Sequence, residues 1–239
     1  MTIEQQLIVA LRNVITSCAD AILPAECAGC RSRGAAVCVQ CRLDLVTAHR
    51  QHRASPADGR IRSAVSYEGV VRRLIIGLKY RNARGAAGLL GGMLARDLIR
   101  DGIQPGVDID VVTWAPTTQA RAKRRGFDQS EIIARTVAAQ LGLPVRSLLE
   151  RVEGDEQKSL TRSERLRAPA FRASATKWRK VLLIDDVITT GATLAAASGA
   201  LRTAGVEHVR CAAVAETPRS RRFEGGCVEP VFAALSTAA

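Results

Sequence analysis

The sequence predicts an α/β domain built on a parallel sheet, with a small cysteine-rich module in front of it. Val181–Ile184 are four consecutive apolar residues without alternation, which is typical of a central strand covered on both faces. Further predicted strands alternate with predicted helices, and two cysteine pairs precede them all. The 239 residues, 47% of them hydrophobic, are enough for one sizeable core and a small appended module.

The first predicted element is an amphipathic helix within residues 1–23. Ile3, Leu7, Leu11 and Val14 recur at helical spacing, with polar side chains between them. The segment lacks the basic start and unbroken apolar stretch of a secretion signal, and it lacks the about twenty apolar residues of a membrane span. We therefore expect a cytoplasmic protein, in which cysteines are more often metal ligands than disulfides.

Two Cys-x2-Cys pairs, Cys27/Cys30 and Cys38/Cys41, predict a structural zinc site. Each pair places two thiolates on one side of a tight turn, and two pairs supply the tetrahedral S4 shell that Zn²⁺ takes in closed sites. The short separation favours a compact pair of knuckles rather than a full ribbon. A redox site is the alternative, but it does not require two copies of the motif. Residues 1–47 are thus expected to form a helix and a zinc module.

A polar segment, residues 48–60, is expected to link this module to the main domain at 61–239. It is rich in arginine and histidine and contains Ser-Pro-Ala-Asp-Gly at 55–59. His49 and His52 are potential metal ligands, but four thiolates already complete a zinc site. We therefore expect both histidines to be exposed to solvent.

Strands and helices are expected to alternate along the main domain, with right-handed crossovers. We expect a strand at 61–67, helices at 70–80 and 86–100, the first strand of the main sheet at 107–114, a helix at 130–141, and strands at 145–149 and 209–214. The polar stretch 150–170 is rich in basic residues and suits a mobile lid over an anion, although a disordered loop fits nearly as well.

A basic loop is predicted at 115–129, after the strand that ends at Trp114. Arg121, Lys123, Arg124 and Arg125 concentrate positive charge there. Because ligands of open α/β sheets bind at the carboxyl ends of the strands, this charge suits the stabilisation of an anionic leaving group. A solvated loop or a DNA-contacting loop is the alternative.

The segment after Ile184 has the composition of a sugar-phosphate site. Two adjacent acids at a strand end can accept hydrogen bonds from vicinal ribose hydroxyls, while threonine hydroxyls and free helix amides can hold a phosphate. Gly191 permits the tight turn between them. The residues are Asp185, Asp186, Thr189, Thr190, Gly191 and Thr193. The spacing matches neither a Walker A loop nor a dinucleotide fingerprint, and acids that only cap a helix would not require three threonines.

This segment resembles the motif for phosphoribosyl pyrophosphate (PRPP) of the type I phosphoribosyltransferases. The resemblance implies that Asp185 and Asp186 bind the ribose hydroxyls and that 189–193 hold the 5′-phosphate. Nearly the whole chain resembles the ComF family, competence-associated proteins with an amino-terminal zinc module and a phosphoribosyltransferase domain. The matching pieces are the cysteine pairs, Tyr67-Glu-Gly, Leu78-Lys-Tyr80, Arg125-Gly-Phe-Asp-Gln129, Gln157, Leu160, Arg165 and the acid-Thr-Thr-Gly motif. Asp128 departs from the usual asparagine, and an asparagine is common in the family near Ala168.

The resemblance implies binding of PRPP with Mg²⁺, and phosphoribosyl transfer with release of diphosphate. Arg124 and Arg125 would stabilise the diphosphate, assisted by Lys79. It also implies a role in DNA uptake, with DNA and competence proteins as partners, and the net charge of +12 favours an anionic partner. A high genomic GC content would also raise the arginine content. The alternative function is a non-catalytic DNA-binding or assembly protein that keeps the fold, since no hood that would select a nucleobase is visible.

Overall fold

The computed structural model describes residues 26–54, 62–80, 84–152 and 169–218. The predicted helix within residues 1–23, the end of the expected linker, most of the polar stretch 150–170 and the last 21 residues, 219–239, lie outside this part of the chain. Among the described residues, no helix combines the length and the hydropathy that a membrane crossing needs.

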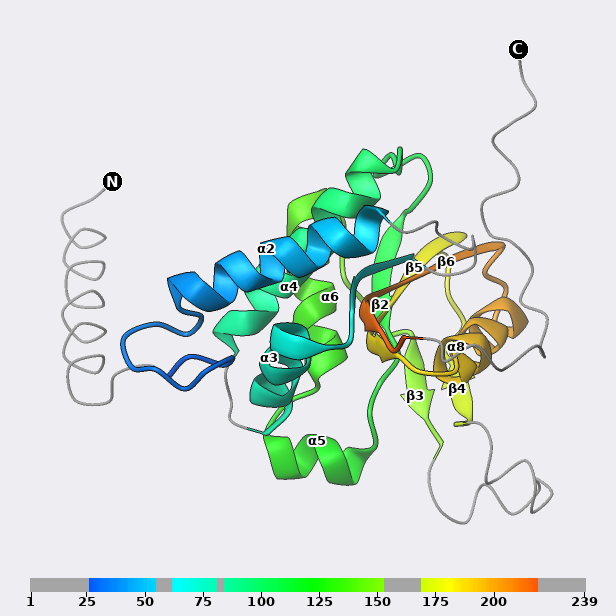
Figure 1. The fold of residues 1–239 in the computed structure, drawn as a ribbon. Helices are drawn as coiled ribbons and strands as arrows, with labels where there is room; N and C mark the ends of the chain where they lie inside the picture. The colour runs from blue at the N-terminus through cyan, green and yellow to red at the C-terminus, as the bar shows by residue number, and fades with distance from the viewer. Residues whose placement is uncertain (1–25, 55–61, 81–83, 153–168, 219–239) are drawn as a thin grey trace, which may run out of the picture.

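A four-stranded parallel sheet forms the centre of the molecule (Figure 1). Its order is β1 (Arg62–Ser66), β6 (His208–Glu216), β5 (Lys180–Ile188) and β2 (Val111–Trp114), and every neighbouring pair is parallel. The predicted α/β class with a parallel sheet is confirmed. The strand at 107–114 is not the first of the main sheet, however, because β1 already pairs with β6.

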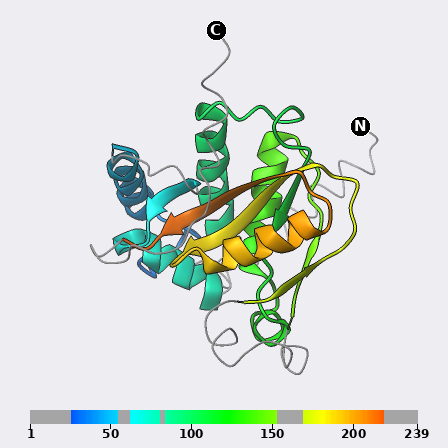
Figure 2. The ribbon, with the colours of Figure 1, turned by 90° about the vertical axis from the view of Figure 1, so that its right-hand side faces the viewer.

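Helices cover both faces of the sheet. α4 (Gly85–Arg100) and α6 (Gln129–Leu141) lie on one face, and α8 (Ala192–Thr203) lies on the other, as Figure 2 shows. α3 (Gly69–Tyr80) contacts α4, and the short α5 (Gln119–Arg125) follows β2. The sheet is therefore the middle of three layers.

Strand β5 shows why an unbroken apolar run predicts this position. Leu182 and Ile184 join the core on the α4 and α6 side, whereas Val181 and Leu183 join the core beneath α8. All four are at most 1% exposed. Full burial of one such side chain contributes roughly 1.5–3 kcal/mol, so both faces of the strand hold it in place.

The expected linker is a helix over most of its length. α2 (Val39–Ala54) begins directly after Cys38 and contains Cys41, the other cysteine of the second pair, and it contacts β1 and α3. The prediction of a linker is therefore wrong for residues 48–54. Leu45, buried in the main core, holds the middle of this helix against the domain.

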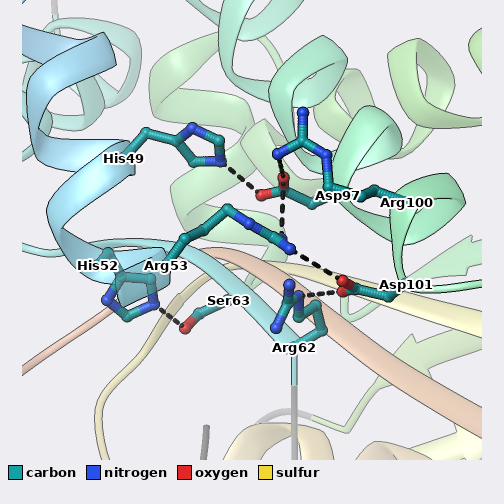
Figure 3. A network of polar contacts seen from close by, with 8 residues as sticks. All are labelled: His49, His52, Arg53, Arg62, Ser63, Asp97, Arg100 and Asp101. Atoms are coloured by element: carbon teal, nitrogen blue, oxygen red, sulfur yellow. Dashed lines mark hydrogen bonds and ion pairs between the residues drawn. The ribbon is translucent and has the colours of Figure 1, made fainter. Parts of the chain in front are cut away.

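His49 joins α2 to α4 through the network in Figure 3, so the expectation that it is exposed is wrong. Its Nε2 lies 2.8 Å from Asp97 Oδ2, and Arg53 forms ion pairs of 3.1 Å with both Asp97 and Asp101. Arg62 of β1 pairs with Asp101 at 2.5 Å. Asp97 is only 1% exposed, so its charge requires these partners.

His52 is also partly buried rather than exposed. Its Nε2 lies 3.0 Å from Ser63 Oγ of β1 and 3.8 Å from Glu216 Oε1, at the end of β6. The two histidines therefore attach α2 to α4 and to the edge of the sheet.

Two further sequence predictions need correction. The basic loop 115–129 contains helix α5, which begins after Thr118, whose Oγ1 accepts the Arg121 N–H at 3.3 Å. The predicted strand 145–149 is not continuous: Val145 makes an isolated parallel bridge to Val112, and β3 (Leu149–Arg151) pairs with β4 (Phe171–Ala173) in a separate antiparallel ribbon. The other predicted helices and strands within the described residues are present, to within a few residues.

Candidate functional site

The site lies where the chain reverses its direction of travel across the sheet. From β2 the chain passes through α6 to Val145, which bridges Val112 on the side of β2 away from β5. From β5 it passes through α8, on the opposite face, to β6. The carboxyl ends of β2 and β5 thus form a topological switch point, where open α/β sheets bind their ligands.

Asp185 and Asp186 are the sixth and seventh of the nine residues of β5, which continues two residues beyond them. Asp185 is buried, and its Oδ1 accepts hydrogen bonds from Ser130 Oγ at 3.1 Å and from the Asp186 N–H at 2.8 Å. Burial, together with the adjacent charge of Asp186, raises the pKa of Asp185 to about 7. The hydrogen bonds and Lys79 act in the opposite direction.

Lys79, the predicted catalytic lysine, reaches Asp186 from the last turn of α3. Its Nζ lies 2.6 Å from Asp186 Oδ2, and both side chains are mostly buried. The structure thus brings together a lysine and an acid 107 residues apart in the sequence. A sugar hydroxyl that binds Asp186 would compete with this ammonium group.

The two predicted catalytic arginines have different surroundings. Arg125 is half-buried: its Nη1 donates to Gln129 Oε1 at 2.6 Å, and its guanidinium lies 5.1 Å from the centre of the Tyr80 ring. Arg124 is exposed on α5. Arg125 thus contacts Tyr80, the residue that follows Lys79 in the sequence, whereas Arg124 presents its charge to solvent.

The loop after β5 turns tightly into the amino terminus of α8. Gly191 has a left-handed φ of 79° and caps α8, as its predicted role in a tight turn requires. Thr190 Oγ1 accepts the Ala192 N–H at 3.3 Å, and Thr217 Oγ1 donates to the carbonyls of Ile188 and Thr189 at 3.4 Å. Thr189 and Thr190 are exposed, and Thr193 is half-buried in the first turn of α8.

Asp128 has a structural role that the sequence did not lead us to expect. It is buried and caps α6, since Oδ1 accepts the N–H groups of Ser130 at 2.9 Å and Glu131 at 3.4 Å. Oδ2 accepts the Thr117 N–H at 2.7 Å, which ties the segment after β2 to α6. Burial raises the pKa of Asp128, against these hydrogen bonds. The Asp-x-x-Glu spacing of Asp128 and Glu131, just before an apolar helix, is the sequence pattern that predicts this cap.

The four predicted metal ligands also come together. The Sγ atoms of Cys27, Cys30, Cys38 and Cys41 all lie within 4.8 Å of one another, and those of Cys30 and Cys38 are 3.6 Å apart. A tetrahedron with Zn–S bonds of about 2.3 Å has sulfur atoms about 3.8 Å apart. The donor set therefore fits a closed zinc site, with a modest adjustment of the widest pair.

The surroundings of Cys27 favour its thiolate form. Burial acts to raise the pKa of Cys27, but N–H groups, including those of Cys38 at 3.3 Å and Gly29 at 3.4 Å, lower it to about 6. The same residues pack into the main domain, because Cys27 and Cys41 belong to one core with Leu74 of α3. The cysteine module shares a core with the domain that follows.

The parallel sheet, the switch point and the acid-Thr-Thr-Gly loop together resemble a type I phosphoribosyltransferase domain. Residues 128–233 match the family described as phosphoribosyl transferase domain. Within the described residues this match runs from α6 to β6 and includes β5, α8 and the loop between them.

Curated relatives confirm the resemblance to the ComF family. The chain is 32% identical over 109 residues to "Competence protein F" of Haemophilus influenzae, a match that covers 42% of this chain and 48% of that protein. It is 37% identical over 98 residues to "Competence protein ComFC" of Streptococcus pneumoniae, over 40% of this chain and 43% of that protein. The chain thus matches less than half the length of each relative.

Solved structures also match, with low structural overlap. The glutamine PRPP amidotransferase from B. subtilis, complexed with ADP and GMP, is 25% identical with a TM-score of 0.39, over 55% of this chain and 26% of that one. A purine phosphoribosyltransferase from Pyrococcus horikoshii is 18% identical with a TM-score of 0.34, over 54% of this chain and 71% of that one.

Proposed function

We propose that this protein binds PRPP at the carboxyl ends of β2 and β5. Asp185 and Asp186 accept hydrogen bonds from the ribose hydroxyls, while the loop Thr189–Thr193 holds the 5′-phosphate. The observation that carries the proposal is the arrangement at β5: two mostly buried acids, with Lys79 on one and Ser130 on the other, precede a left-handed glycine at a helix amino terminus.

The proposed reaction is phosphoribosyl transfer. The bond from C1′ to the diphosphate oxygen breaks, its electron pair leaves with the diphosphate, and an acceptor atom or water forms the new bond at C1′. Lys79, Arg124 and Arg125 would stabilise the charge that develops on the leaving group. Mg²⁺ bound with PRPP would neutralise further phosphate charge. When ribose binds Asp186, Lys79 becomes available to face the diphosphate.

We further propose a structural zinc ion in the amino-terminal module. The four sulfur atoms of this module fit a tetrahedral shell without other ligands. The proposed division of the chain is a helix and zinc module at 1–47, followed by the phosphoribosyltransferase-like domain, with α2 joining the two. α2 is part of a shared core, so the zinc would stabilise its first turn against α3.

A role in competence is proposed from the names of the two relatives, whereas a role in DNA uptake and a cytoplasmic location are proposed from the sequence. The second candidate function is therefore a non-catalytic DNA-binding or assembly protein that keeps the PRPP site. The exposed basic residues Arg121, Lys123 and Arg124 on α5 favour it. Non-specific DNA binding through these residues would weaken as salt rises.

Calorimetric titration with PRPP and Mg²⁺, combined with an assay for released diphosphate, tests these functions. Saturable binding of PRPP supports the proposed site, and its absence would contradict the proposal. Diphosphate release that accelerates with one added nucleobase or amine establishes an enzyme. Binding without release, together with salt-dependent DNA affinity, favours the second candidate.

A further inference from the structure

Helix α2 presents apolar side chains to solvent on one side. Val39, Leu43 and Val46 are 74%, 56% and 45% exposed, and their spacing of four and three residues aligns them on one face. They are half of the six large hydrophobic side chains that are exposed in the described part of the chain. Scattered single residues need no explanation, but a row of three on one helix is typical of a binding surface.

A groove adjoins this row. It lies between α2 and α4 and has a volume of about 350 Å³. Its lining includes apolar Leu45, Val46 and Met93 and basic Arg42, Arg96 and Arg100. Val46 belongs to both features, so the exposed row and the groove form one surface, which we call the α2 surface. Its residues belong to α2 and α4, two helices that Figure 1 labels.

We propose that residues 3–22 of this chain bind the α2 surface as an amphipathic helix. Their sequence places Ile3, Leu7, Leu11 and Val14 at helical spacing, so a helix formed there has an apolar face that needs a partner. An isolated helix of this length is marginal in water without such packing. The α2 surface offers the complementary apolar face.

The point at which the segment joins the domain supports this occupant. The described chain begins at Glu26, which bridges Arg33, and the Sγ of the next residue, Cys27, accepts the N–H of Cys38 immediately before α2. The segment therefore meets the domain beside the first turn of α2. Pro24, between Ile22 and Glu26, cannot continue a helix and favours a change of direction there.

The length and the charge of residues 3–22 also match those of the α2 surface. A helix over residues 3–22 would be about 30 Å long and the 16 residues of α2 span about 24 Å, so the segment can cover α2 in the antiparallel direction. This direction places Asp20 near the amino half of α2, where Arg42 lies. Among charged side chains the segment carries Glu4 and Asp20 against Arg12 alone. The groove is lined by three arginines and one acid, Asp97, which already forms an ion pair with Arg53.

Amide hydrogen exchange on the full chain, followed by mass spectrometry, tests the proposal. We expect amides of residues 3–22 to exchange more than tenfold more slowly than an unstructured chain, since burial of several large apolar side chains should stabilise the docked helix. Leu43→Glu with Val46→Glu should abolish this protection. The matched control Val107→Glu changes a valine that is 57% exposed outside the α2 surface, and it should leave the protection intact.

A second pair of substitutions avoids any effect on the domain itself. Leu7→Glu with Leu11→Glu should also abolish the protection of residues 3–22, while exchange in β5 and α6 stays as in the parent. Protection that persists in both double variants, or no protection in the parent, would overturn the proposal. Protection that disappears on dilution, together with a concentration-dependent mass, would assign the α2 surface to a second copy of the chain instead.

Discussion

At the scale of single residues, the proposed binding of PRPP depends on the charges of Asp185 and Asp186. Replacement of both by asparagine keeps their size but removes the charge that strengthens a hydrogen bond from a hydroxyl, worth about 1.5–3 kcal/mol for each bond. We expect PRPP affinity to fall on the order of a hundredfold or more, at about 1.4 kcal/mol per factor of ten. Calorimetric titration of the double variant Asp185→Asn/Asp186→Asn with PRPP measures this loss of affinity. Asp110→Asn is the matched control, since Asp110 directly precedes β2 and its carboxylate accepts the N–H of Lys180 at the amino end of β5. Unchanged affinity in the double variant would refute the assignment of these acids.

The raised pKa of Asp185 predicts a pH dependence. Because its pKa is about 7 in the folded chain, above the ordinary 3.8, the folded state holds this proton more firmly between pH 4 and pH 7 than the unfolded state. The free energy of unfolding should therefore fall as pH rises through this window, by at most about 1.4 kcal/mol per pH unit from this group. PRPP affinity should rise over the upper part of the window, since the carboxylate is the better acceptor. Titrations of Asp185→Asn at several pH values should show both trends weakened.

At the scale of helices and strands, the contact between α2 and α4 depends on Asp97. Asp97→Asn would leave His49 and Arg53 around a neutral amide, and breaking a buried ion pair costs roughly 3–5 kcal/mol. We expect a loss of stability of that order in urea unfolding. Glu207→Gln, in the exposed pair with Arg179, should cost at most about 1 kcal/mol. Similar losses in the two variants would show that the network contributes little.

The elements also show what a sequence predicts and what it leaves out. The β5 strand and the loop after it were predictable because Val181–Thr193 are contiguous and each residue type has a local role. Helix α5 was not, since seven mostly polar residues carry no apolar period. The contacts of Ser130 with Asp185 and of His49 with Asp97 join positions 55 and 48 residues apart, and only the packing of the sheet and helices brings them together.

At the scale of the whole molecule, α2 couples the cysteine module to the sheet. It begins among the cysteines and ends in the network with α4 and β1. His52 of α2 lies beside Glu216 at the end of β6, and the next residue, Thr217, holds the carbonyls of Ile188 and Thr189. The module and the candidate phosphate loop are thus connected by a chain of direct contacts.

Because the cysteine module shares a core with the main domain, the proposed zinc site bears on the stability of the whole domain. We expect about one zinc ion per chain in protein purified without chelators, and Cys30→Ser should lower this content because it removes one of four ligands. Cys211→Ser is the matched control, since Cys211 lies in β6 outside the cluster. Protein without zinc would contradict the proposed site.

Removal of the zinc should also destabilise more than the module. Cys27 and Cys41 are 1% and 2% exposed and share a core with Leu74 and Leu78 of α3, the helix that carries Lys79. Chelation should therefore lower the midpoint of thermal unfolding of the domain by at least about 5 °C, since the free energy of metal binding contributes to folding. Calorimetric scans with and without chelator measure the shift. An unchanged midpoint after complete loss of zinc would show that the module folds and unfolds independently of the sheet, in spite of their common core.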